Sequence, residues 1–250
     1  MIDLGHLSPW LLLLTPFVIV LAYTVFGLSG FGSTAIAVPI LAHFLPVSYL
    51  VPLMALLDCA SSIFVGTTGR EHLAKDELKW LIPFMFVGFV IGATVLVHVP
   101  DHYLRLALGV FAMTIGVYSI ANPVMHRAIS RLWVVPVGVL GGAAATVFGA
   151  GGPIYATYLS GRLGNKSQVR ATTSALISVS TVTRAILYAA TGLLLHTAIA
   201  LGTVVLAPFV WVGLKLGTRI HLGLSQQQMR RVVGALLVFT GASLLVRVFF

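Results

Sequence analysis

The chain has 250 residues, of which 58% are apolar and 8% are charged, and its mean hydropathy is +1.03. So little polar surface cannot cover a water-soluble globule, and the composition therefore indicates an integral membrane protein. The 15 Lys and Arg against 6 Asp and Glu give a net charge of +9, which in a membrane protein is typical of cytoplasmic loops and gives no reason to expect a nucleic-acid partner.

Eight stretches of the chain approach the roughly 20 mostly apolar residues that a membrane-spanning helix requires. They cover residues 9–28, 47–66, 80–98, 103–121, 132–148, 168–193, 196–214 and 229–249. The first lacks a basic leader region and a small-residue cleavage site, so we expect a retained helix and no signal peptide.

Two shorter apolar segments, 33–45 and 152–160, follow glycine-rich breaks with the sequences FGLSGFG and FGAGGP. A broken helix is tolerated at membrane depth only where protein or a water-filled cavity surrounds the exposed backbone. The predicted fold is therefore an all-α polytopic membrane protein with eight long helices plus two short broken or re-entrant segments.

The two halves of the chain are related in sequence. A shift of 125 positions brings a proline, a phenylalanine, a valine, an arginine and four glycines into coincidence. These are eight identities in the 34 positions from 83 to 116, where an apolar composition alone gives roughly three. The coincident glycines are Gly88, Gly92, Gly109 and Gly116 in the first half and Gly213, Gly217, Gly234 and Gly241 in the second. We expect two related transmembrane repeats, 1–124 and 125–250, that form one obligate unit.

The positive charge of the loops predicts how the repeats are oriented. When the short segments are counted, giving five segments per half, twelve Lys and Arg fall on one face and two, Arg105 and Arg247, on the other. The twelve are Arg70, Lys75, Lys79, Arg127, Arg131, Arg162, Lys166, Arg170, Lys215, Arg219, Arg230 and Arg231. Counting eight helices alone scatters these residues over both faces, so the positive-inside rule favours five segments per half. An odd number makes the repeats inverted with both termini extracytoplasmic, whether the short segments cross the membrane or form re-entrant hairpins.

Inverted repeats with discontinuous helices are the usual architecture of secondary transporters, whose sites lie near the midplane at the repeat interface. Ser29, Ser33 or Thr34 is a candidate N-cap for the first short segment, and Pro153 suits the first helical position of the second. The exposed amides and positive dipole ends of the two segments are then expected to form an anion site. The alternative is that the glycines only let helices pack closely.

The motifs FGLSGFGSTAIAVPIL and FGAGGPIYATYLSGRLG, together with the recurring Pro-Phe, Val-Gly and later Gly positions, resemble the sulfite exporter TauE/SafE family of bacterial inner-membrane permeases. The resemblance covers both halves of the chain. It implies proton-linked movement, often export, of small sulfur-containing anions such as sulfite or organosulfonates. Family members tend to be richer in glycine where this chain has Ser29 and Phe31.

The resemblance also implies where the substrate binds. The family's glycine segments correspond here to Gly27, Gly30 and Gly32 with Pro39, and to Gly149, Gly151 and Gly152 with Pro153. We therefore expect substrate contacts from the two breaks, namely Gly27, Ser29, Gly30, Phe31, Gly149, Gly151, Gly152 and Pro153.

Two charged residues fall inside apolar segments, where ionisable side chains are costly and mark function by default. Asp58 and Arg184 lie 126 positions apart, close to the repeat shift, so we expect them to approach each other at the centre. In the functional interpretation Arg184 offers its planar fork to two oxygens of a sulfonate or sulfite, and Asp58 takes up the coupling proton. In the alternative they form a buried ion pair that only locks the halves together.

The segment around Arg184 is rich in hydroxyl side chains, and Thr173 is a candidate substrate ligand among them. Most of these hydroxyls are expected to bond helix backbone or neighbouring helices. The group comprises Thr172, Thr173, Ser174, Ser178, Ser180, Thr181 and Thr183. The histidines sit at segment ends with no spacing that would gather a metal site, so we expect neither a metal nor a cofactor.

Two other functions are compatible with the sequence. The sequence GLSG at Gly27 to Gly30 matches the pattern of intramembrane serine proteases, with Ser29 as nucleophile and His43 or His196 as base. The second repeat has Gly151 where the first has Ser29, so the repeat keeps the glycines and loses the nucleophile. A passive anion channel is the other alternative, because the same cavity conducts if both ends are open together. The exact substrate and the oligomeric state are left open.

The charge distribution generates a prediction about topology. A reporter fused after Phe250 is expected to be extracytoplasmic, and a reporter inserted near Lys75 cytoplasmic, because twelve of fourteen loop cations then face the cytoplasm. Alkaline phosphatase and fluorescent-protein fusions measure the two locations. Finding both reporters on one side of the membrane would contradict the inverted repeat.

Overall fold

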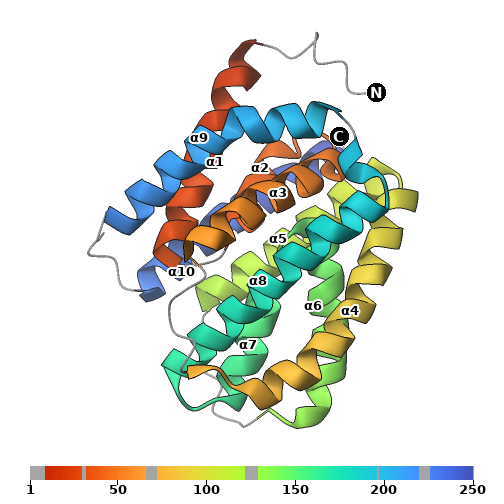
Figure 1. The fold of residues 1–250 in the computed structure, drawn as a ribbon. Helices are drawn as coiled ribbons and strands as arrows, with labels where there is room; N and C mark the ends of the chain where they lie inside the picture. The colour runs from red at the N-terminus through yellow and green to blue at the C-terminus, as the bar shows by residue number, and fades with distance from the viewer. Residues whose placement is uncertain are drawn as a thin grey trace.

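The structure is a computed structural model that describes residues 9–29, 32–65, 72–121, 129–195, 197–219 and 226–249. Within these ranges the chain folds into helices and connecting loops, with no β-strand (Figure 1). The helices are α1 (Pro9–Ser29), α2 (Ser33–Leu41), α3 (Val47–Val65), α4 (Lys75–His98), α5 (Asp101–Ala121), α6 (Val134–Phe148), α7 (Gly152–Arg162), α8 (Lys166–Ala190), α9 (Thr197–Arg219) and α10 (Gln226–Phe249).

Seven of the described helices are long and apolar enough to cross a membrane, and α3 is apolar over a shorter stretch, Val47–Ser61. Each of the eight predicted long segments corresponds to one helix, and the two predicted short segments correspond to α2 and α7. The all-α polytopic fold is therefore confirmed.

Some of the long helices extend beyond the apolar stretches that predicted them. Helix α4 begins at Lys75, before the predicted start at 80, and α9 continues to Arg219, past the predicted end at 214. Asp76 and Glu77 lie in the first turn of α4 and Arg219 in the last turn of α9. Acidic side chains at a helix N-terminus and basic ones at a C-terminus are favoured by the helix dipole, which explains why these charged turns remain helical.

Three closely packed helix pairs build the bundle: α4 with α6, α5 with α10, and α1 with α9. In Figure 1 the α1 and α9 pair and the α4 and α6 pair lie at opposite ends of the bundle, with α3 and α8 between them. Helices α3 and α8 also pack against each other, so the centre of the molecule is the contact between these two helices.

Glycines allow two of the pairs to approach closely. A Cβ on Gly88 of α4 would overlap the carbonyl oxygen of Val139 in α6. A Cβ on Gly213 of α9 would lie 2.7 Å from the carbonyl oxygen of Val20 in α1. Such backbone proximity is typical of membrane helices, whose association depends on van der Waals packing rather than on the hydrophobic effect.

The third pair uses glycines from both of its helices. A Cβ on Gly109 of α5 would lie 3.2 Å from the Gly241 carbonyl oxygen, and a Cβ on Gly241 of α10 would lie 2.8 Å from that of Gly109. Gly116 and Gly234 have the same reciprocal relation. Because Gly109 precedes Gly116 while its partner Gly241 follows Gly234, the two helices run antiparallel.

A buried carboxylate connects α4 to the far end of α7. Glu77 is 5% exposed and accepts hydrogen bonds from Tyr158 Oη at 3.0 Å and Arg162 Nη2 at 2.9 Å. Arg162 also donates from Nη1 to the carbonyl oxygen of Ile129 at 3.2 Å. These bonds fix the C-terminal end of a short helix whose N-terminal end lies deep in the bundle.

The close helix contacts generate a stability prediction. Gly88→Ala is expected to lower the free energy of unfolding by roughly 1–3 kcal/mol, because the added methyl must displace the backbone of α6. Thermal unfolding in detergent, followed by circular dichroism, measures the loss. Gly164→Ala is the matched control, since nothing lies within 4 Å of a Cβ built there. Equal melting temperatures for the two variants would show that α4 and α6 do not pack as described.

Candidate functional site

The two helix breaks meet inside the bundle. Helix α1 ends at Ser29 and α2 begins at Ser33, while α6 ends at Phe148 and α7 begins at Gly152. Gly149 has φ 70°, a left-handed conformation that favours glycine, and a Cβ there would overlap the methyl group of Thr34. The second break therefore lies directly against the first turn of α2, and Gly149 cannot gain a side chain without separating them.

Asp58 of α3 is the centre of a cluster of buried hydroxyls. Its Oδ1 accepts hydrogen bonds from Tyr23 Oη at 2.7 Å and from Ser33 Oγ at 2.6 Å, and its Oδ2 accepts one from Thr34 Oγ1 at 2.5 Å. Asp58 is 6% exposed and Tyr23 is fully buried. One carboxylate thus joins α1, α2 and α3.

The predicted side-chain cap of α2 is wrong for the described residues. The N-cap is Gly32, with φ 99° and no side-chain hydrogen bond, and the hydroxyls of Ser33 and Thr34 donate to Asp58 instead. A hydrogen bond to a carboxylate is roughly twice as strong as a neutral one, which explains why the hydroxyls turn away from the helix backbone. Pro153 is the second residue of α7, one position after the predicted first, and still within the first turn, where a missing N–H is tolerated.

Arg184 of α8 is 3% exposed and faces the same cluster. Its Nη1 donates to the carbonyl oxygen of Ala145 at 2.8 Å. Its Nη2 lies 3.5 Å from Thr181 Oγ1 and 3.9 Å from Asp58 Oδ2, and its Nε has no hydrogen-bond partner in the described structure. Nη1 is therefore occupied, whereas the edge formed by Nε and Nη2 makes no short hydrogen bond to the protein.

A small cavity lies between the breaks and these charges. Its lining comprises Phe26, Gly32, Ser33, Thr34, Ala35, Asp58, Gly149, Ala150, Gly152, Pro153, Ile177, Thr181 and Arg184. Five of the predicted site residues are brought together here: Asp58, Gly149, Gly152, Pro153 and Arg184. The predicted approach of Asp58 to Arg184 is observed.

Three other predicted residues lie away from the cavity lining. Gly27 packs against Gly217 of α9, and Gly151 packs against Gly141 and the ring of Tyr155. For these two glycines the contacts agree with the alternative, close helix packing, rather than with the expected substrate contact. Thr173 is buried without a partner for its hydroxyl, two turns before Thr181 along α8.

Gly30 and Phe31 fall outside the described residues, as does the side chain of Ser29. The substrate contacts predicted for these three residues therefore stay predictions. Sequence reasoning missed Tyr23, Phe26 and Ile177. Helical spacing could have found Ile177, because it lies one and two turns before Thr181 and Arg184 on one face of α8. Nothing in the sequence marks Tyr23 as a partner of Asp58.

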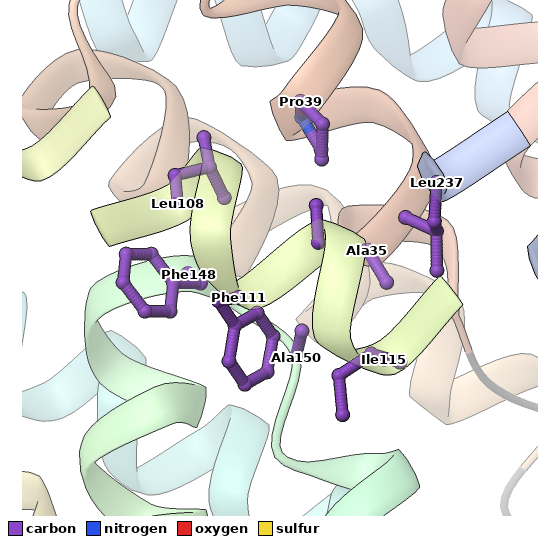
Figure 2. Close-up of a pocket in the computed structure, with 9 residues that line it drawn as sticks. Ala35, Pro39, Leu108, Phe111, Ile115, Phe148, Ala150 and Leu237 are labelled. Carbon is purple, nitrogen blue, oxygen red and sulfur yellow. The ribbon is translucent and has the colours of Figure 1, made fainter. Parts of the chain in front are cut away.

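The polar cavity adjoins a second cavity whose lining is entirely apolar (Figure 2). It is a small cavity between α2, α5, the end of α6 and α10. Figure 2 shows Pro39 and Ala35 of α2 opposite Leu108, Phe111 and Ile115 of α5. Ala35 and Ala150 line both cavities, which shows that the two adjoin. The apolar cavity lies at the contact that α2 makes with α5 and α10.

The described residues offer no group of three or more His, Cys, Asp or Glu side chains that could hold a metal ion. The cavity is lined by a buried guanidinium whose Nε has no partner in the described structure, by a carboxylate and by the N-terminal ends of two short helices. A helix bundle broken around a buried charged site is the architecture expected of a membrane transporter.

Comparison with known proteins identifies which transporters it resembles. A profile of the sulfite exporter TauE/SafE family matches residues 16–244, and the chain therefore belongs to that family. It is 24% identical over 194 residues to the probable inner membrane transporter protein TsaS of Comamonas testosteroni, covering 77% of this chain and 81% of that protein. No solved structure matches the chain at a significant level.

Proposed function

We propose that the protein is a secondary transporter that exports small sulfur-containing oxyanions, sulfite or organosulfonates, across the bacterial inner membrane by proton-coupled alternating access. The observation that carries the proposal is the buried Arg184 guanidinium beside the two short helices: its Nε has no hydrogen-bond partner in the described structure, and its Nη2 makes only long contacts, to Thr181 and Asp58. Membership of the sulfite exporter family and similarity to an inner membrane transporter support the substrate class and the location.

The geometry around Arg184 suits an oxyanion. The Nε and Nη2 groups of a guanidinium donate two parallel hydrogen bonds to two oxygens of a carboxylate, phosphate or sulfonate. The N-terminal turns of α2 and α7 line the same cavity and contribute backbone N–H groups and positive dipole ends. A sulfonate at Arg184 therefore meets donors from both halves of the chain.

The helix packing supports an inverted repeat. Gly88 and Gly213, which the 125-residue shift superposes, each approach a backbone carbonyl of a neighbouring helix, Val139 in α6 and Val20 in α1. Helices α5 and α10 pair through repeat-related glycines reciprocally and antiparallel. A two-fold axis that exchanges antiparallel membrane helices lies in the membrane plane, which is the symmetry of inverted-repeat transporters.

The two short helices are packed unequally, which supports alternating access. Eight of the nine residues of α2 are buried, against three of eleven in α7. Helix α2 packs against α5 and α10, while α7 makes no contact of that extent with either helix in the described part of the chain. In the second conformation, α7 would contact α5 and α10 in place of α2. The site would then open to the other side of the membrane. The apolar lining of the cavity beneath α2 supports this movement, because no polar side chain lines it and no hydrogen bond between these side chains has to break when the helices separate (Figure 2).

Asp58 is the proposed site of the coupling proton. Its carboxylate lies 3.9 Å from Arg184 and holds the hydroxyls of Ser33 and Thr34 at the start of α2. Protonation would weaken these charge-assisted bonds and release α2 from α3. Proton binding and movement of α2 are thereby coupled through one side chain.

Flux through proteoliposomes tests the function. The purified protein is expected to transport sulfite and methanesulfonate in preference to acetate, with a rate that depends on the proton gradient. Arg184→Lys is expected to lower the flux at least tenfold, because a point charge cannot reproduce the two-pronged contact. Transport that prefers carboxylates, or is equally fast in the lysine variant, would contradict the proposal.

Charge-removing variants separate a substrate ligand from a structural ion pair. Asp58→Asn and Arg184→Gln are each expected to lower the free energy of unfolding by roughly 3–5 kcal/mol, because each leaves an uncompensated buried charge. The double variant is expected to recover the melting temperature but not the flux. A double variant that transports at the wild-type rate would instead assign the pair a purely structural role.

Cross-linking α2 to α10 distinguishes a carrier from a passive channel. His43 Nε2 lies 3.1 Å from Ser243 Oγ, at the end of α2 opposite the site. In a Cys59→Ser background, a short bis-methanethiosulfonate reagent joining His43→Cys to Ser243→Cys is expected to stop the flux, and dithiothreitol to restore it. Single-cysteine variants treated with the same reagent are the controls. A cross-linked protein that still passes anions at the uncross-linked rate would favour the channel.

A further inference from the structure

The charges that line the polar cavity cancel in number. Among its lining residues Arg184 is the cation and Asp58 the anion, and the remaining side chains are uncharged. Both are nearly inaccessible, at 3% and 6% exposure, and their closest N and O atoms lie 3.9 Å apart. The two side chains alone therefore leave the cavity neutral.

The helix ends shift this balance toward the positive. Gly32 to Ala35 at the start of α2 and Gly152 and Pro153 at the start of α7 line the cavity. Each helix N-terminus is equivalent to about +0.5 elementary charge, so two of them add about one positive charge. An independent observation indicates that a ligand neutralises this excess positive charge. In the described structure, Nε of Arg184 is buried without a hydrogen-bond partner beside the same helix ends.

Asp58 cannot withdraw from the cavity to admit more negative charge. Tyr23, Ser33 and Thr34 hold its two oxygens at 2.7, 2.6 and 2.5 Å, and these donors belong to two different helices. The carboxylate consequently stays beside any anion that binds Arg184. A second negative charge on that anion would be left uncompensated in a region of low dielectric, which is strongly unfavourable.

We propose, on the basis of the proposed transport function, that the site is charge-matched to oxyanion groups that carry one negative charge and that Asp58 excludes those that carry two. Sulfonates and hydrogen sulfite fit this rule, whereas sulfate does not. Sulfite fits the rule because it binds as hydrogen sulfite, with the proton on the anion itself, whereas sulfate carries two charges near neutral pH. The carboxylate in an anion site then acts as the charge filter.

Methanesulfonate and sulfate form a matched pair for the test, because both are tetrahedral and similar in size but carry one and two charges. Competition against radiolabelled methanesulfonate flux in proteoliposomes, at constant ionic strength, measures their relative affinities. In the wild-type protein sulfate is expected to compete at least tenfold more weakly than methanesulfonate. In Asp58→Asn the ratio is expected to shift at least tenfold toward sulfate, because the filter charge is gone.

Thr114→Ala is the control, since it removes a hydroxyl that bonds the backbone of its own helix at Val110 and lies outside the cavity, and the sulfate to methanesulfonate ratio is expected to stay at the wild-type value. Should Asp58→Asn be too unstable for transport, its melting temperature in detergent is measured with each anion. Sulfate is then expected to raise it more than methanesulfonate does, the reverse of the wild-type order.

The outcomes separate the inference from the function on which it rests. A wild-type protein that moves methanesulfonate but is inhibited equally by sulfate overturns the charge match and leaves the transport function standing. An unchanged ratio in Asp58→Asn, by flux or by melting temperature, shows that Asp58 is not the filter. A protein that neither transports nor is stabilised by either anion overturns the proposed function and the charge match together.

Discussion

The structure depends on the requirement that a charge buried in a membrane protein be surrounded by partners. Asp58 accepts hydrogen bonds from Tyr23 of α1 and from Ser33 and Thr34 of α2, and it lies beside Arg184 of α8. These partners come from three different helices. The hydrogen bonds and the ion pair of one carboxylate therefore determine where the first helix break lies. Charged groups at membrane depth are costly enough to impose such order on the helices around them.

The second break is positioned from the opposite side of the same cluster. Arg184 donates to the Ala145 carbonyl in the last turns of α6, and Gly149 lies against Thr34 with no space for a side chain. Two short helices thereby begin at one cavity, although they are more than a hundred residues apart in the chain. Eight of the nine residues of α2 are buried, against three of eleven in α7, and under the proposed alternating access these unequal contacts belong to one of two conformations.

Much of the fold could be predicted because the thickness of the bilayer sets the length of every spanning helix. Each such helix is therefore visible in the sequence as an apolar stretch of roughly 20 residues. The helix breaks were also predictable, since glycine-rich sequence interrupts an apolar run visibly. For the candidate site, the two charges were found because ionisable residues are rare in such segments. Their neighbours Ile177 and Tyr23 were not, because nothing in their residue types separates a cavity lining from an ordinary packed helix.

The sequence by itself thus determined the class of protein, the positions of its helices and the identity of the two buried charges. The tertiary structure decided what each break residue does. Gly27 and Gly151 serve helix packing while Gly149 and Gly152 line the cavity, and Ser33 and Thr34 serve Asp58 rather than the helix end. The physical reason is that glycine and hydroxyl residues have several favourable environments in a membrane protein, and only the neighbouring helix determines which one each residue occupies.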